Sequence, residues 1–182
     1  MTTLDTLREC HRIVWQYRRE LEAVWPTPDR LDSLRFATTE AAEALDAWLR
    51  LNGTYARNRD KDLSILDELA DCAPMLITAL GAKAEARRVG FVAVWADETP
   101  EELVSYVAVL TGIERNYQNG IGASLQDSDL WRAVRAIADV KGMDLPARLT
   151  ARLERIKAKR LPQSEAADLD LEYTWLNQAG SL

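Results

Sequence analysis

The amino-acid sequence predicts an all-α fold, arranged as one antiparallel helical bundle with additional helices toward its C-terminal end. Apolar residues recur at three- and four-residue spacing through most of the chain, which is the period of a helix with one buried face. The 8 glycines and 6 prolines fall mostly between these stretches. Only residues 89–95 are also compatible with a strand, and no second segment offers that strand a partner, so we expect helix or coil there.

The first two helices are expected at about residues 2–24 and 29–51. The first contains no glycine or proline, and Thr3 is of a residue type that caps helix N-termini. Two prolines after Trp25 end this helix, because each disfavours a helical conformation in the residue before it. The second helix should stop at Asn52-Gly53. The two apolar stripes are Leu4, Leu7, Val14, Leu21 and Val24, and Leu34, Ala37, Ala41, Leu45 and Trp48.

A polar, basic loop at residues 54–60 leads to a third helix, expected at about 61–80 and ended by Gly81. Pro74 lies inside this helix, where it removes one backbone hydrogen bond and should produce a kink. The apolar stripe of this helix is Leu63, Leu66, Ala70, Ala73 and Ile77.

Three more helices are expected in the second half of the chain. One begins at Thr99-Pro100, with threonine as the cap and proline at the first helical position, and ends near Asn119-Gly120. The next starts between Ser124 and Asp129 and ends at Lys141-Gly142, and the last runs from about Leu145 to Arg160. We therefore divide the chain into a main bundle at 1–120, additional helices at 121–161 that pack on this bundle or form an oligomer interface, and an acidic tail at 162–182.

The composition excludes some classes of function. The net charge of −6 argues against stable nucleic-acid binding, which needs a basic surface. No apolar run approaches the length of a membrane span, and the first residues do not resemble a signal peptide. Cys10 and Cys72 are too few to form a disulfide framework, so we expect two reduced thiols and a cytoplasmic protein.

Two pairs of acidic residues stand out, one on each of the second and third expected helices. Glu40 and Glu43 are three residues apart, as are Glu68 and Asp71, so each pair lies on one face of its helix. If the two helices form an antiparallel hairpin, the pairs lie level, because the midpoint between them falls in the loop, between Tyr55 and Ala56. Four facing carboxylates would bind Mg²⁺ or Mn²⁺ well and would repel one another without a cation.

The setting of Glu40 gives a second reason to expect a cation. Glu40 lies beside Phe36, Ala47 and Leu51 on the helix surface, outside the polar face of the helix. Placing a charged carboxylate at the edge of an apolar face costs free energy unless the group is paired, protonated or bound to a metal. Glu68 and Asp71 are less informative, since they fall on the polar side of their helix. The alternative is that both pairs are ordinary solvated helix surface.

The motif Glu40-x-x-Glu43, followed about two dozen residues later by Glu68-x-x-Asp71, resembles the metal-binding signature of the all-α nucleoside triphosphate pyrophosphohydrolases. The stretches TEAAEALD at 39–46 and DELAD at 67–71 are similar to MazG-like members of that superfamily, which also includes dimeric dUTPases. The resemblance covers roughly residues 10–110 and does not extend beyond Gly120.

This resemblance implies a reaction and an assembly. Water would attack the α-phosphorus of a (deoxy)nucleoside triphosphate, such as dGTP or dUTP, and release the monophosphate and pyrophosphate. Glu40, Glu43, Glu68 and Asp71 would hold Mg²⁺ or Mn²⁺, and Glu40 or Glu43 would take the proton of the attacking water. The implied assembly is a homodimer or homotetramer. The rival hypothesis is a non-catalytic helical protein whose acidic cluster binds a metal or a basic partner.

Several other residues are candidates for contacts with substrate. Phosphates would be bound by basic or polar residues near the hairpin turn and after the third helix, although solvated surface is the simpler interpretation. These residues are Arg57, Asn58 and Lys61, and Lys83 and Arg87. Phe36, Trp15 and Trp48 are candidates for stacking on a base, but core packing is the commoner role of aromatics at helical spacing. The single histidine, His11, is interpreted as a boundary residue.

Overall fold

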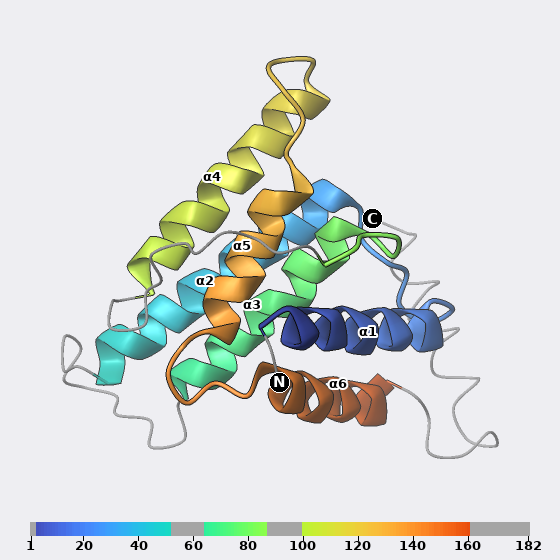
Figure 1. The fold of residues 1–182 in the computed structure, drawn as a ribbon, viewed down its shortest axis with the longest axis vertical. Coiled ribbons are helices and arrows are strands. Elements are labelled where there is room, and N and C mark those ends of the chain that lie inside the picture. Colours follow the sequence, from blue (N-terminus) through green and yellow to red (C-terminus); the bar gives the residue numbers. More distant parts are fainter. Residues whose placement is uncertain (1–2, 52–63, 87–99, 161–182) are drawn as a thin grey trace, which may run out of the picture.

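The computed structural model describes residues 3–51, 64–86 and 100–160, and within these ranges the chain forms six α-helices and no β-strand. The all-α prediction is therefore confirmed (Figure 1). The helices are α1 (Thr3–Leu21), α2 (Arg30–Leu51), α3 (Ile65–Leu80), α4 (Glu101–Gln118), α5 (Asp127–Ala138) and α6 (Leu145–Arg160).

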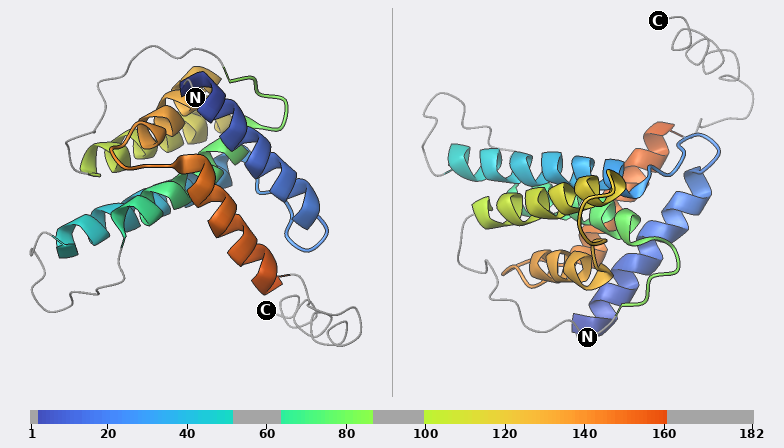
Figure 2. Two further views of the ribbon diagram at one scale, coloured as in Figure 1. Left: turned by 60° about the horizontal axis from the view of Figure 1, so that its bottom comes forward. Right: turned by 90° about the horizontal axis from the view of Figure 1, so that it is seen from above.

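An antiparallel pair, α2 and α3, forms the centre of the fold (Figure 1). Helix α4 packs along α2, and α5 packs against α3. Helices α1 and α6 lie side by side and cross the end of this group, where both contact α3 (Figures 1 and 2). The C-terminal helices thus cover the same α2–α3 pair that carries the acidic motif.

Small residues allow α2 and α3 to approach closely. Ala37, Ala41 and Ala44 on α2 are fully buried, as are Cys72 and Ala73 on α3. Cys72 lies so close to α2 that its thiol donates to the carbonyl oxygen of Ala37 at 3.3 Å. Two helix axes can come this close only where the side chains between them are short, so the short distance between the acidic side chains of α2 and α3 depends on these small residues.

Helix α2 agrees with its expected range, whereas one end of α1 and one end of α3 differ from expectation by a few residues. Helix α1 ends at Leu21, and a turn follows in which the amides of Val24 and Trp25 donate to the Leu21 carbonyl, so Val24 is exposed rather than part of the stripe. Helix α3 begins at Ile65 and not near residue 61, because Ser64 has an extended backbone and its side chain accepts from the Asp67 amide.

The second half of the chain follows the predicted order. Pro100 precedes α4 as its cap residue rather than occupying the first helical position. Helix α5 ends at Ala138 and not at Lys141, because Val140 and Met143 turn inward to pack against the core before α6 begins. Helix α6 spans the predicted residues, and the Asp144 carboxylate accepts from the Ala147 amide at its start.

Two further predictions concern the core, and of these the kink at Pro74 stays a prediction. Helix α3 continues through Pro74, whose carbonyl oxygen accepts from the hydroxyl of Thr78 at 2.7 Å. Cys10 and Cys72 are buried and free, as expected of reduced thiols. Within the described ranges, none of the helices combines the length and the apolarity that crossing a bilayer would require.

Candidate metal centre

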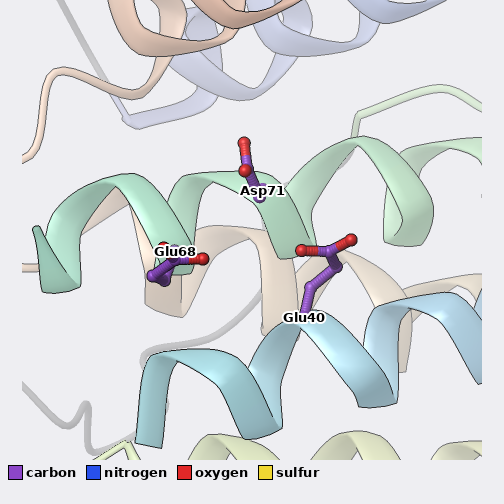
Figure 3. Close-up of side chains that lie close together, drawn as sticks. All are labelled: Glu40, Glu68 and Asp71. Carbon is purple, nitrogen blue, oxygen red and sulfur yellow. The ribbon is translucent and has the colours of Figure 1, made fainter. Parts of the chain in front are cut away.

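Three of the four predicted carboxylates meet between α2 and α3. Glu40 on α2 and Glu68 and Asp71 on α3 each offer an oxygen atom, and these atoms all lie within 4.8 Å of one another. Figure 3 shows Glu40 extending from α2 toward α3, which bears the other two side chains. The prediction that the acidic residues of the two helices lie level is therefore confirmed for Glu40, Glu68 and Asp71. We call these three residues the acidic triad.

Glu43 lies at the edge of the acidic triad. Its side chain is exposed, and among the described residues it is not one of the three whose oxygens converge. Burial is the main cause that raises the pKa of Glu68 and of Glu40, and the negative charge of Glu43 adds to both shifts. Glu43 is thus close enough to act on the site electrostatically without sharing its centre.

Burial and mutual repulsion make the charged form of the acidic triad costly. Burial, followed by the charges of Asp71 and Glu43, raises the pKa of Glu40 to about 7. Burial also raises the pKa of Asp71 to about 6, against the opposing effect of Arg152. The pKa of Glu68 is raised as well, mainly by burial. Such shifts are typical of carboxylates held together for a cation or for proton transfer.

Helix α6 brings a basic residue to the acidic triad. The guanidinium of Arg152 lies 2.8 Å from the carboxylate of Asp71, whose side chain is only 13% exposed. One turn earlier on α6, Arg148 pairs with Asp67 at the outer end of α3. Asp71 is therefore not on a solvated face, as its place on the isolated helix suggested, because α6 covers it.

Sequence analysis missed this contribution of α6, although a signal was present. Arg148, Arg152 and Arg155 are spaced at four and three residues, which places them on one face of a helix. The charges of both Arg152 and Arg155 act on Asp71. A basic face on one helix indicates an acidic partner surface, but the spacing alone does not say which helix carries that surface.

The acidic triad suits a hard divalent cation. Carboxylate oxygens are the ligands that Mg²⁺ and Mn²⁺ prefer, and oxygens within 4.8 Å of one another can reach one ion or two neighbouring ions. The raised pKa values give a physical reason for such binding, since a cation would relieve the repulsion among Glu40, Glu68 and Asp71. One of the charges, on Asp71, is already balanced by Arg152.

A pocket of about 280 Å³ opens beside the acidic triad. Glu40, Asp71 and Arg152 form part of its wall, and most of the remaining surface is apolar or aromatic. The other lining residues are Val14, Tyr17, Arg18, Trp25, Pro26, Pro28, Phe36, Pro74, Met75, Leu153 and Ile156. We call this the aromatic pocket; it joins a charged rim to an apolar interior.

The predicted substrate-binding residues are not brought to this site by the described part of the chain. Arg57, Asn58, Lys61 and Arg87 lie outside the described residues. Lys83 is exposed and lines a different, more polar pocket of about 700 Å³, together with Arg30 and Trp131. The two pockets share no lining residue.

The aromatic candidates separate into two groups. Phe36 is 54% exposed and lines the aromatic pocket, so its interpretation as a core residue is wrong. Trp15 is partly buried against the core, and its indole nitrogen donates to the carbonyl oxygen of Ile77. Trp48 is also partly buried. His11, as expected, is a boundary residue, with its Nε2 3.0 Å from the Gly81 carbonyl oxygen.

Comparison of the chain with protein-family models, with curated proteins and with solved structures found no match. The resemblance to the all-α pyrophosphohydrolases therefore depends on the acidic motif of this chain. What the structure adds to that motif is the convergence of Glu40, Glu68 and Asp71 between two of the helices in the described part of the chain.

Proposed function

We propose that this chain is a metal-dependent nucleoside triphosphate pyrophosphohydrolase of the MazG-like type. The observation that carries the proposal is the convergence of Glu40, Glu68 and Asp71 between two antiparallel helices, with their pKa values raised. In the proposed reaction, a water oxygen bonds to the α-phosphorus and the bond from that phosphorus to the α–β bridging oxygen breaks. The products are a nucleoside monophosphate and pyrophosphate.

Glu40, Glu68 and Asp71 would hold Mg²⁺ or Mn²⁺ in this proposal. The bound ion supplies charge neutralisation for the triphosphate and acidifies a coordinated water. Glu43 is suited to accept the proton of the attacking water, because it lies at the edge of the acidic triad and is exposed. Glu40 is the alternative base, since its pKa of about 7 matches the pH at which a general base is most effective.

Arg152 has a second role in the proposal. In the metal-free protein its guanidinium balances Asp71 at 2.8 Å. A cation bound to Asp71 would take over that role and leave Arg152, which is 42% exposed, able to pair with a phosphate oxygen at the pocket rim. The same residue would then stabilise the site before binding and contact substrate afterward.

The proposal includes assembly into a homodimer or homotetramer. Helix α4 exposes Val109, Ile113 and Tyr117, which are spaced four residues apart and therefore form one apolar stripe. A second copy of the chain would cover this stripe. Light scattering should give a mass of two or four chains, and Ile113→Glu should reduce it to one.

A non-catalytic role remains the second candidate, and one observation favours it. Asp71 and Asp67 are both paired with arginines of α6, so part of the acidic surface already has an internal partner. In that case the acidic cluster would join α3 to α6 or hold a structural ion. This candidate predicts metal binding without turnover of any nucleotide.

Incubation of the full chain with each dNTP and each NTP in the presence of Mn²⁺ distinguishes the two candidates. Formation of monophosphate and pyrophosphate, lost in Glu40→Gln, supports the proposal. Glu102→Gln, on α4, is a control that changes one carboxylate outside the acidic triad. Metal binding without any turnover would reject the enzyme, and release of inorganic phosphate would reject this choice of scissile bond.

A further inference from the structure

Arg18 on α1 is buried without a carboxylate partner among the described residues. It is only 3% exposed, and no described acidic oxygen lies within 4.0 Å of its guanidinium nitrogens. Burial lowers its pKa, and the charges of Tyr17 and then Glu22 oppose this shift without reversing it. Burying a guanidinium in this way is costly unless it interacts with something else.

The described contacts of Arg18 use only some of the N–H donors of its guanidinium group. Its Nε donates to the hydroxyl of Thr78 at 3.2 Å, and its Nη2 has only the thioether sulfur of Met75, at 3.8 Å. Among the described residues, these two contacts involve Nε and Nη2, and neither involves Nη1. The guanidinium also lies over the ring of Trp25, with its central carbon 5.1 Å from the ring centroid. The terminal nitrogens of Arg18 are thus available to an additional acceptor.

Arg18 is part of the wall of the aromatic pocket. Tyr17, Trp25 and Phe36 line the same pocket and give it flat, apolar surfaces. Phe36 is 54% exposed and lines the pocket, so its ring is accessible to a ligand there. The pocket therefore offers stacking surfaces together with a buried, positively charged hydrogen-bond donor.

The aromatic pocket and the acidic triad are adjacent, since Glu40 and Asp71 belong to both. A ligand in the pocket would therefore extend its remaining groups toward the carboxylates and Arg152. An aromatic ring attached to a phosphate chain has this arrangement of an apolar end and an anionic end.

We propose that the aromatic pocket binds the base of the nucleotide and that Arg18 selects guanine by donating to its O6 and N7. This inference rests on the proposed function, which supplies the nucleotide as substrate. Guanine presents two adjacent hydrogen-bond acceptors, O6 and N7, on one edge of the base. The two terminal nitrogens of an arginine can donate to both. Adenine presents a donor in place of O6, which would face the arginine N–H groups unfavourably.

Binding of nucleosides to the metal-free full chain tests the inference without requiring catalysis. The indole N–H signal of Trp25 is followed by NMR during titration with deoxyguanosine, deoxyinosine, 7-deazadeoxyguanosine and deoxyadenosine. Deoxyinosine, which keeps O6 and N7, should bind like deoxyguanosine. Loss of N7 in the 7-deaza analogue, or of O6 in deoxyadenosine, should weaken binding roughly fivefold or more. Equal binding of all four nucleosides would overturn the role of Arg18.

Two variants with matched controls locate the contact. Arg18→Met should weaken deoxyguanosine roughly tenfold and deoxyadenosine little, whereas Arg19→Met, on the exposed face of α1, should change neither. Removing Arg18 leaves the Thr78 hydroxyl its own acceptor, the Pro74 carbonyl, so the variant creates no unpaired donor there. Phe36→Ala, at an exposed position, should weaken all four nucleosides about fivefold or more, with Leu51→Ala as its control.

The failure of this inference is distinguishable from failure of the proposed function. Guanine-selective binding without turnover of dGTP rejects the enzyme and keeps the pocket assignment. Turnover of several dNTPs at similar rates, unchanged in Phe36→Ala and Arg18→Met, keeps the enzyme and rejects the assignment. A shift of the Trp25 signal by inorganic triphosphate but by none of the nucleosides, lost in Arg18→Met, would show that Arg18 binds phosphate and would also reject the assignment.

Discussion

Arg152 on α6 lies 2.8 Å from Asp71 on α3, and this ion pair ties the C-terminal helices to the acidic triad. Arg152 and a metal ion would compete for the same carboxylate. The pair thus stabilises the metal-free protein at some expense of metal affinity, because a carboxylate with a cation nearby gains less from binding another.

Replacement of Arg152 measures this competition. We expect Arg152→Gln to bind Mn²⁺ more tightly than the unchanged protein in the absence of nucleotide, and to turn over nucleotide more slowly because a phosphate contact is lost. Isothermal titration gives the first quantity and a pyrophosphate assay the second. Arg148→Gln is the matched control, since Arg148 pairs with Asp67, which is outside the acidic triad. Weaker Mn²⁺ binding in Arg152→Gln alone would contradict the competition.

Metal binding should release protons near neutral pH. The pKa of Glu40 is about 7 and that of Asp71 about 6, so both retain protons at pH 6 that a cation must displace. Apparent Mn²⁺ affinity should therefore rise from pH 6 to pH 8. Titration in buffers with different ionisation enthalpies gives the number of protons released, and Glu40→Gln should reduce it. A proton count of zero at pH 6.5 would contradict the raised pKa values.

The stability of the metal-free protein should fall over a related pH range. Because the pKa of Glu40 is raised from 4.5 to about 7 on folding, the folded protein binds more protons than the unfolded chain between these values. Stability therefore decreases as the pH rises through this range. Urea unfolding at pH 5 and pH 7.5 measures the change, and saturating Mn²⁺ should reverse it. A Glu40→Gln variant with the same pH dependence would assign the effect to other groups.

Glu43 should affect turnover more than metal affinity. It is exposed and is not among the three described carboxylates whose oxygens converge. We expect Glu43→Gln to keep the helical fold, to bind Mn²⁺ nearly as well as the unchanged protein, and to lose about 10²-fold or more in rate, as for removal of a general base. Unchanged activity would remove Glu43 from the site.

The N-terminal cap of α3 should matter for stability. Ser64 accepts from the Asp67 amide one turn before Glu68, so it fixes the helix end nearest the acidic triad. Ser64→Ala should reduce the free energy of unfolding by about 1 kcal/mol, and Ser64→Asp should retain most of it. Chemical denaturation with the two variants side by side tests this expectation. Equal losses in both would mean that the side-chain cap contributes little.

The helix order and the meeting of Glu40 with Glu68 were predictable because both depend on local signals. The end of α3 follows from Gly81, the prolines after Trp25 separate α1 from α2, and the level arrangement follows from the rise of a helix and the place of its turn. Helix boundaries were less predictable. Ser64 shortens α3 through a capping bond that a polar segment alone does not specify.

The surroundings of the site were not predictable from local pattern. Asp71 lies on the polar face of its own helix, but α6 covers it in the folded chain. Which two helices pack together when they are distant in sequence is decided by tertiary structure and not by local pattern. Phe36 looked like a core residue because periodicity shows which face is apolar and not whether another helix covers it. Arg18 is buried for a similar reason, since only the approach of Trp25 and Met75 removes it from water.

Hydrolysis in ¹⁸O-labelled water with Mn²⁺ tests the central claim most directly. With dGTP as substrate, the account predicts one labelled oxygen on the α-phosphate of dGMP, unlabelled pyrophosphate, and loss of both products in Glu40→Gln. Labelled pyrophosphate, or turnover that survives Glu40→Gln, would contradict hydrolysis at the α-phosphorus by the acidic triad.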